Sequence, residues 1–125
     1  MEKLFIDGTE DTPEVLLDPD KSRFVFSGKS IPEDVSAFYG PVLKWIDSYK
    51  QKPNNETVVD FKMEYFNTAS SKIILDILMK FEEIHSTVTK LKINWHFSPK
   101  DLDMKDAGEE YADIVEVPFD FVKMA

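Results

Sequence analysis

The hydroxyl-rich segment Asn67-Thr68-Ala69-Ser70-Ser71 contains the residue types in this sequence that could carry chemistry most directly. It stands between an apolar strand pattern and an apolar helix pattern, so we expect it at the turn where the helix begins. Asn, Thr and Ser often cap such a turn, and residue types alone favour a cap. The alternative is that Thr68 accepts a phosphate, because the unpaired N–H groups and the dipole of a helix start favour an anion.

The helix expected after this segment, from residue 70 to roughly Ser86, has one apolar and one polar sector. The apolar sector should pack on a sheet and contains Ile73, Ile74, Ile77, Leu78, Phe81 and Ile84. Lys72, Asp76, Lys80 and Glu83 form the solvated sector. Leu75 and Met79 project among these polar residues, and we expect them near the helix start. Ordinary surface and a partner interface are both open for these two residues.

A phosphate on Thr68 would act on binding rather than on shape. It adds about −1.5 to −2 charges, which a helix start can accommodate without unfolding. A docked protein would instead meet a bulky dianion inside a desolvated contact. The candidate partner-binding surface around Thr68 consists of Asn67, Ala69, Ser70, Ser71, Lys72, Leu75 and Met79.

The other polar residues predict no metal, cofactor or catalytic site. His85 falls at the edge of the apolar helix sector and His96 on the polar face of a strand, and two separated histidines without Cys make a poor metal site. Asp101, Asp103 and Asp106 lack the Gly and Glu of a calcium loop, and they fit better as charges at a helix start. The sequence has no glycine-rich phosphate loop. We therefore expect a protein that is not an enzyme.

Length, composition and charge restrict the class of protein. With 125 residues, 42% hydrophobic and 13% aromatic, the chain fits one compact domain over residues 1–125. Its net charge of −9 disfavours binding to nucleic acids and to anionic membrane surfaces. The sequence has no Cys, no apolar run long enough for a membrane span and no signal peptide pattern. We expect a cytoplasmic protein.

Alternating apolar residues predict strands at residues 4–6, 15–17, 23–27, 59–65, 91–97 and 117–121. An acidic loop is expected from Asp7 to Pro13, and a tight turn at residues 18–21 makes the second and third strands a hairpin. In the strand before the hydroxyl-rich segment, Val59, Phe61, Met63 and Tyr65 should share the buried face.

Helical spacing predicts two further helices. One follows Pro32 and presents Phe38, Val42, Trp45 and Tyr49 to the core, with a kink or a restart at Gly40-Pro41. The other covers about residues 101–114. The strand, helix and strand over residues 59–97 form a right-handed crossover between parallel neighbours. The fold class is therefore α/β, a two-layer sandwich in which helices cover one face of a mixed β-sheet.

Several short segments together point to a known family. They are Gly8-Thr9, Thr12-Pro13, Phe26-Ser27-Gly28, Ser30-Ile31-Pro32-Glu33, Phe38-Tyr39-Gly40-Pro41 with Trp45, Asn94-Trp95-His96-Phe97, Ala107-Gly108-Glu109, Pro118-Phe119 and, most specific of all, Tyr65-Phe66-Asn67-Thr68. The sequence resembles the SiaC family of bacterial regulatory phosphoproteins along nearly its whole length. This resemblance implies a STAS-like fold, similar to that of anti-sigma-factor antagonists. Ala69 departs from the serine expected in many relatives, which leaves Thr68 as the acceptor, with Ser70 and Ser71 as lesser candidates.

The resemblance also implies partners. A kinase would phosphorylate Thr68 and a PP2C-type phosphatase would remove the phosphate. The unphosphorylated form would bind and activate a diguanylate cyclase, so phosphorylation would lower cyclic di-GMP output and act on biofilm formation. Two alternatives stay open: an antagonist that sequesters an anti-sigma factor, and an enzyme or ligand carrier with a cleft near His96 and Trp95, for which fold alone gives no support.

Overall fold

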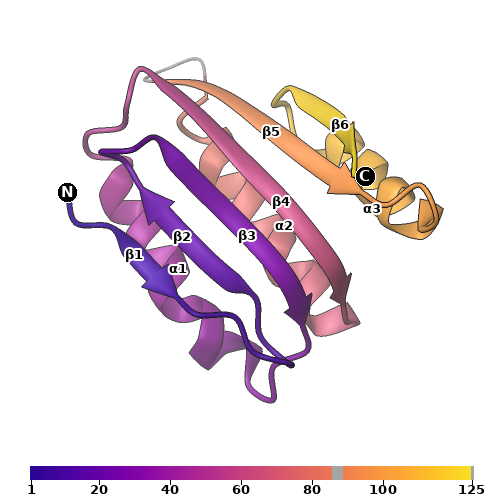
Figure 1. Cartoon of the computed structure of the whole chain (residues 1–125). Coiled ribbons are helices and arrows are strands. Elements are labelled where there is room, and N and C mark those ends of the chain that lie inside the picture. Colours follow the sequence, from indigo (N-terminus) through magenta and orange to yellow (C-terminus); the bar gives the residue numbers. More distant parts are fainter. Residues whose placement is uncertain (86–88, 125) are drawn as a thin grey trace.

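The computed structural model describes residues 1–85 and 89–124, and this part of the chain forms one sheet covered by helices (Figure 1). The elements are β1 Leu4–Ile6, β2 Glu14–Asp18, β3 Arg23–Ser30, α1 Val35–Tyr49, β4 Glu56–Phe66, α2 Thr68–Glu82, β5 Lys90–Phe97, α3 Leu102–Ile114 and β6 Phe119–Lys123. Each predicted strand and helix has a counterpart among these elements, although β6 begins at Phe119 and not at residue 117 as predicted.

The six described strands lie in the sheet in their sequence order. β1, β2 and β3 pair antiparallel, whereas β3, β4, β5 and β6 pair parallel. Each parallel connection contains one helix, and the three helices lie on the same side of the sheet (Figure 1). The prediction of a mixed α/β sheet with helices on one face is confirmed.

Aromatic side chains fill the core between the sheet and the helices. Phe61 of β4 stacks on Phe26 of β3 and on Trp95 of β5, with ring centroids 4.8 and 5.5 Å apart. Trp95 is fully buried, and its indole N–H donates to the Met104 carbonyl of α3 at 2.8 Å. A Cβ added at Gly108 of α3 would overlap the Trp95 ring. Gly108 therefore allows α3 to pack closely on β5.

α1 differs from the prediction in its buried face, and of the kink or restart expected at Gly40-Pro41 the restart is absent. Tyr39, Val42, Ile46 and Tyr49 are buried, whereas the predicted Phe38 and Trp45 are half-buried. The face is rotated because Tyr39 hydrogen-bonds inside the core, to Ser30. The helix also runs through Pro41 without a restart. Pro41 cannot donate to the carbonyl four residues earlier, at Ala37, but both residues are exposed, so water can satisfy that carbonyl.

β4 carries a bulge that reverses the predicted orientation of Tyr65. Gly28 of β3 pairs with Met63, and the next residue, Lys29, pairs with Tyr65, so Glu64 is an extra residue on β4. Gly28 has a φ of +114°, which L side chains rarely adopt. Because the extra residue shifts the alternation, Tyr65 is 54% exposed and Phe66 turns inward. The expectation that Tyr65 is buried was wrong.

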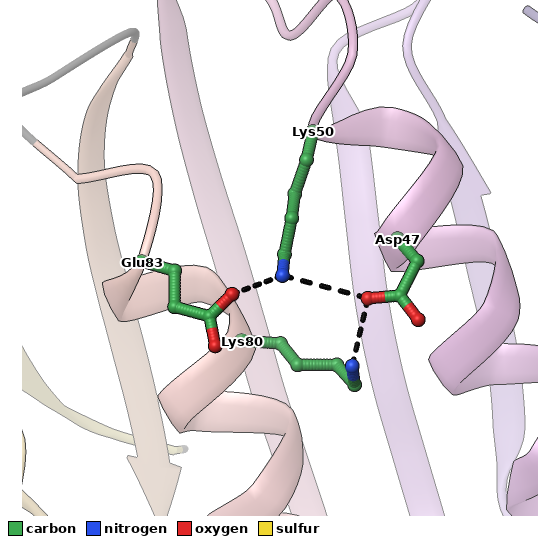
Figure 2. Close-up of polar contacts among 4 residues, drawn as sticks. All are labelled: Asp47, Lys50, Lys80 and Glu83. Atoms are coloured by element: carbon green, nitrogen blue, oxygen red, sulfur yellow. Dashed lines mark hydrogen bonds and ion pairs between the residues drawn. The ribbon is translucent and has the colours of Figure 1, made fainter.

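A charged cluster links the ends of α1 and α2 (Figure 2). Asp47 of α1 accepts a hydrogen bond from Lys80 at 2.7 Å and lies 3.5 Å from Lys50, and Lys50 also pairs with Glu83. The hydrogen bond from Lys80 lowers the pKa of the Asp47 carboxyl. The hydrogen bond with Glu83 raises the pKa of Lys50. Both carboxylates are exposed, so solvent screens these interactions.

We predict that Gly108→Ala destabilises the protein by about 1–3 kcal/mol, because the added methyl group overlaps Trp95 in a packed core. Urea denaturation followed by tryptophan fluorescence measures the change. Gly40→Ala is the matched control, since a Cβ there meets nothing within 4 Å. It should change the free energy of unfolding by less than about 1 kcal/mol. Equal effects of both substitutions would contradict this packing.

We also predict that Asp47→Asn lowers the melting temperature slightly at neutral pH and low salt. A carboxylate with a lowered pKa stabilises the fold above that pKa, and this contribution is lost as the pH falls through it. The difference from wild type should therefore disappear in acid and at high salt. Asp20→Asn, at an exposed carboxylate outside the ion pairs of the described residues, is the control and should show no such pH dependence. A deficit that persists in acid would exclude the electrostatic cause.

Candidate functional site

Asn67 caps α2, and this assigns the capping role that the sequence left open. Its backbone is extended, its side-chain oxygen accepts from the Ser70 N–H at 2.9 Å, and its carbonyl accepts from the Ser71 N–H at 2.9 Å. The helix therefore begins at Thr68, two residues earlier than predicted. It ends at Glu82, and the predicted end near Ser86 lies outside the described residues. Thr68 is the first helical residue and is not the cap.

The Thr68 side chain is exposed at this helix start. Its hydroxyl makes no hydrogen bond to residues 1–85 or 89–124, while its carbonyl accepts from the Ser71 hydroxyl at 2.7 Å. The helix itself supplies no acceptor for the N–H groups of Thr68 and Ala69. A free hydroxyl thus lies next to two N–H donors and the positive end of the helix dipole. This geometry suits a phosphate.

Ser70, a lesser acceptor candidate, is buried and its hydroxyl is already used. Ser70 Oγ donates to the Ser30 carbonyl at 2.9 Å, and this bond uses its one proton. The 2.8 Å contact between Ser30 Oγ and Ser70 Oγ is therefore donated by Ser30, and the 2.6 Å contact between Tyr39 and Ser30 is donated by Tyr39. Burial raises the pKa of Tyr39, which keeps the phenol protonated. Ser70 is a structural residue, and the sequence-based candidacy as an acceptor was wrong.

Besides β3 and α1, α3 also contacts the start of α2. Tyr111 donates its hydroxyl to the Ser71 carbonyl at 2.7 Å. Burial raises the pKa of Tyr111, so its hydroxyl stays a donor. The ring of Phe66, one residue before the cap, contacts those of Trp95 and Tyr111, with centroids 6.3 and 6.4 Å away. Contacts from three elements therefore hold the backbone on both sides of Thr68.

The structure brings together most, but not all, of the predicted partner-binding surface. Ala69 and Lys72 are exposed beside Thr68, and Ser71 and Leu75 are half-buried. Ser70 is inside the protein. Met79 is 45% exposed, but it lies in the second half of α2, roughly 16 Å along the axis from Thr68 at 1.5 Å per residue. The expectation that Met79 lies near the helix start was wrong, because Met79 comes nine residues after the predicted start at Ser70 and eleven after the observed start at Thr68.

Two exposed apolar side chains at this end of the molecule were not predicted from the sequence. Tyr65 is 54% exposed three residues before Thr68, and Leu102 is 60% exposed at the start of α3. The sequence signal for the exposure of Tyr65 is Gly28 in the neighbouring strand β3, because this glycine permits the bulge at Glu64 of β4. The loop before β2 also reaches this end, since the Ile31 N–H donates to the Asp11 carbonyl at 2.8 Å.

The alternative of a cleft near His96 and Trp95 gains no support, because the two side chains lie on opposite faces of β5 and cannot line one cleft together. Trp95 is fully buried under the helices, while His96 points to the other face of β5, where its Nε2 lies 2.8 Å from Asp60. Asp101 caps α3 by accepting from the Met104 N–H at 3.2 Å. His85 accepts from the Leu91 N–H at 3.1 Å.

The described residues offer neither a metal-binding cluster nor a membrane-spanning helix. They contain no cluster of three or more His, Cys, Asp or Glu residues arranged to hold a metal ion. No helix in residues 1–85 or 89–124 has both the length and the apolar character needed to cross a bilayer.

The chain is similar to known proteins both in sequence and in structure. The chain is 29% identical to an uncharacterized protein of Pseudomonas aeruginosa strain UCBPP-PA14, over 95% of this chain and 94% of that protein. Its structure is similar to that of apo-SiaC from P. aeruginosa, with a TM-score of 0.90, 28% identity and coverage of 98% and 99% of the two chains.

A second solved structure is that of the P. aeruginosa diguanylate cyclase SiaD in complex with its activator SiaC, where the TM-score is 0.90, the identity 27% and the coverage 97% and 99%. The model of the SiaC family of regulatory phosphoproteins matches residues 6–124. The chain therefore belongs to the SiaC family of regulatory phosphoproteins.

Proposed function

We propose that this protein is a non-catalytic phospho-switch in which Thr68 carries the phosphate. A partner kinase adds the phosphate, and a PP2C-type phosphatase removes it. The observation that carries the proposal is the exposed, unpartnered Thr68 hydroxyl at the start of α2, next to a Ser70 hydroxyl that is buried and used. Of these two hydroxyls, only that of Thr68 is accessible to another enzyme.

Thr68 is placed so that a phosphate would leave the fold intact. The dianion would lie near the N–H groups of Thr68 and Ala69 and the positive end of the helix dipole. Lys72 is exposed four residues later, on the same side of the helix, and can approach the phosphate. The buried hydrogen bonds of Ser30, Tyr39 and Ser70 do not involve the Thr68 side chain.

We further propose that the unphosphorylated form binds and activates a diguanylate cyclase. The support is the solved complex of the related SiaC with the cyclase SiaD. The proposed contact surface is the exposed start of α2, with Ala69, Lys72 and the half-buried Leu75 beside Thr68. A phosphate there would insert a hydrated dianion into the contact, and its desolvation would oppose binding.

We predict that incubation with the cognate kinase and ATP places one phosphate on Thr68, located by mass spectrometry of peptides. Thr68→Ala should abolish the label. Ser71→Ala is the matched control and should be labelled like wild type, because Ser71 donates its hydroxyl to the Thr68 carbonyl. Labelling of Thr68→Ala to the wild-type extent would remove Thr68 from the proposal.

We predict that Thr68→Glu weakens binding to the cyclase at least tenfold in calorimetry. Its melting temperature should stay within about 2 °C of wild type, as expected for an exposed residue. Ser48→Glu, which adds the same charge at an exposed position of α1, should bind like wild type. Wild-type affinity of Thr68→Glu, or capture of an anti-sigma factor in place of a cyclase from lysate, would contradict the proposed output.

A further inference from the structure

Lys72 lies one turn after Thr68 on α2, and the described part of the chain does not use its charge. Its side chain is exposed and makes no ion pair or hydrogen bond there. The other lysine of α2, Lys80, belongs to the charged cluster shared with α1. On α3, Lys105 pairs at 3.2 Å with a glutamate four residues later. Lys72 therefore differs from these two lysines in being available to a new anion.

The spacing of residues on α2 leaves one competitor for Lys72. Residues three and four positions away lie beside it on the helix surface, and they are Thr68, Ala69, Leu75 and Asp76. Of these only Asp76 is charged, and it stands C-terminal to the lysine, which is the weaker order for such a pair. The first turn of α2 contains no acidic residue. A phosphate on Thr68 would supply the anion in the stronger order, N-terminal to Lys72.

The elements packed against this helix start contribute neutral phenols and a carboxylate. Tyr39 of α1 and Tyr111 of α3 are hydroxyl donors, and burial raises the pKa of each. The charge of Glu110 raises the pKa of Tyr111 further. On β3, Lys29 faces the other side of the sheet, because it precedes Ser30, whose hydroxyl bonds to Tyr39 on the helix side.

The exposed segments at this end of the molecule carry both signs of charge. Glu64 of β4 and Asp11 of the loop before β2 are exposed carboxylates. Carboxylates disfavour the second negative charge of a phosphate and so raise its second pKa. Lys100 is an exposed cation in the turn after β5, outside α2. Lys72 is distinguished from Lys100 by its place one helical turn from Thr68.

We propose that Lys72 pairs with the phosphate on Thr68 and holds it against α2 as a dianion. The inference rests on the proposed phosphorylation of Thr68 and adds the residue that sets the charge of the modified form. The second pKa of a phosphorylated side chain is about 6, so an unpaired phosphate would be partly monoanionic in mildly acidic solution. A neighbouring cation favours the dianion and lowers that pKa, which keeps the full charge of the switch as the pH falls.

Phosphorus NMR tests the pair on the full chain with phosphothreonine incorporated at position 68 during translation, so that no kinase is needed. The pH dependence of the phosphorus signal gives the second pKa of the phosphate. Lys72→Gln should raise this pKa by about 0.2–0.4, as expected for one ion pair across a helical turn. Lys72→Arg retains the cation and should keep the wild-type value.

Lys100→Gln is the matched control, because it removes an exposed lysine at the same edge of the sheet but outside α2. It should change the second pKa of the phosphate by less than about 0.1, because solvent and salt screen charges that are not in contact. The effect of Lys72→Gln should also disappear at high salt and in concentrated urea, where the helix that brings the two side chains together is lost.

The outcomes separate the pair from the proposed function. Equal phosphate pKa values in wild type and Lys72→Gln, an equal rise in Lys100→Gln, or a difference that persists in urea would overturn the pair. If the kinase places no phosphate on Thr68 of the wild-type protein, the proposed function fails, and the titration decides separately whether the pair forms. Melting curves of each variant confirm that the proteins compared are folded.

Discussion

The carbonyl oxygen of Ser30 holds the end of β3 against the start of α2, and the geometry of the site depends on this contact. It accepts the Asn67 N–H at 3.1 Å and the Ser70 hydroxyl at 2.9 Å. The Ser30 hydroxyl extends the contact to Tyr39 of α1. Because these groups are buried, the loss of one partner leaves another unsatisfied, at a cost of about 1–3 kcal/mol. The helix start is thereby fixed, with Ser70 inside and Thr68 outside.

This arrangement separates the residue that we propose is modified from the residues that support it. The cap is Asn67, the buried donor is Ser70, and the Thr68 hydroxyl has neither task. A charge added at Thr68 therefore perturbs a surface and not a core. The same end of the molecule presents the exposed Tyr65 side chain on an acidic protein. In a protein that regulates by binding, a change of charge on the exposed surface can act through the partner that contacts it.

Much of the fold could be predicted from the sequence because local patterns determine it. The strict alternation in residues 91–97 and the apolar stripe of α2 identify elements whose partners are their neighbours in sequence. Tyr65 and the buried face of α1 were misplaced for tertiary reasons. A bulge permitted by a glycine in another strand reversed Tyr65, and a buried hydrogen bond between Tyr39 and Ser30 rotated the face of α1. Thr68 was found through the family resemblance, because residue types alone favoured a cap.

Amide hydrogen exchange tests most directly whether a phosphate on Thr68 changes partner binding and leaves the fold unchanged. The fully phosphorylated and the unphosphorylated protein are compared, each alone and with the cyclase. The account predicts that the two free forms have equal protection in β3 and in α2 from Ile74 to Phe81. It also predicts that the cyclase protects the start of α2 in the unphosphorylated form alone. Loss of protection along α2 on phosphorylation, or equal protection of both forms by the cyclase, would contradict it.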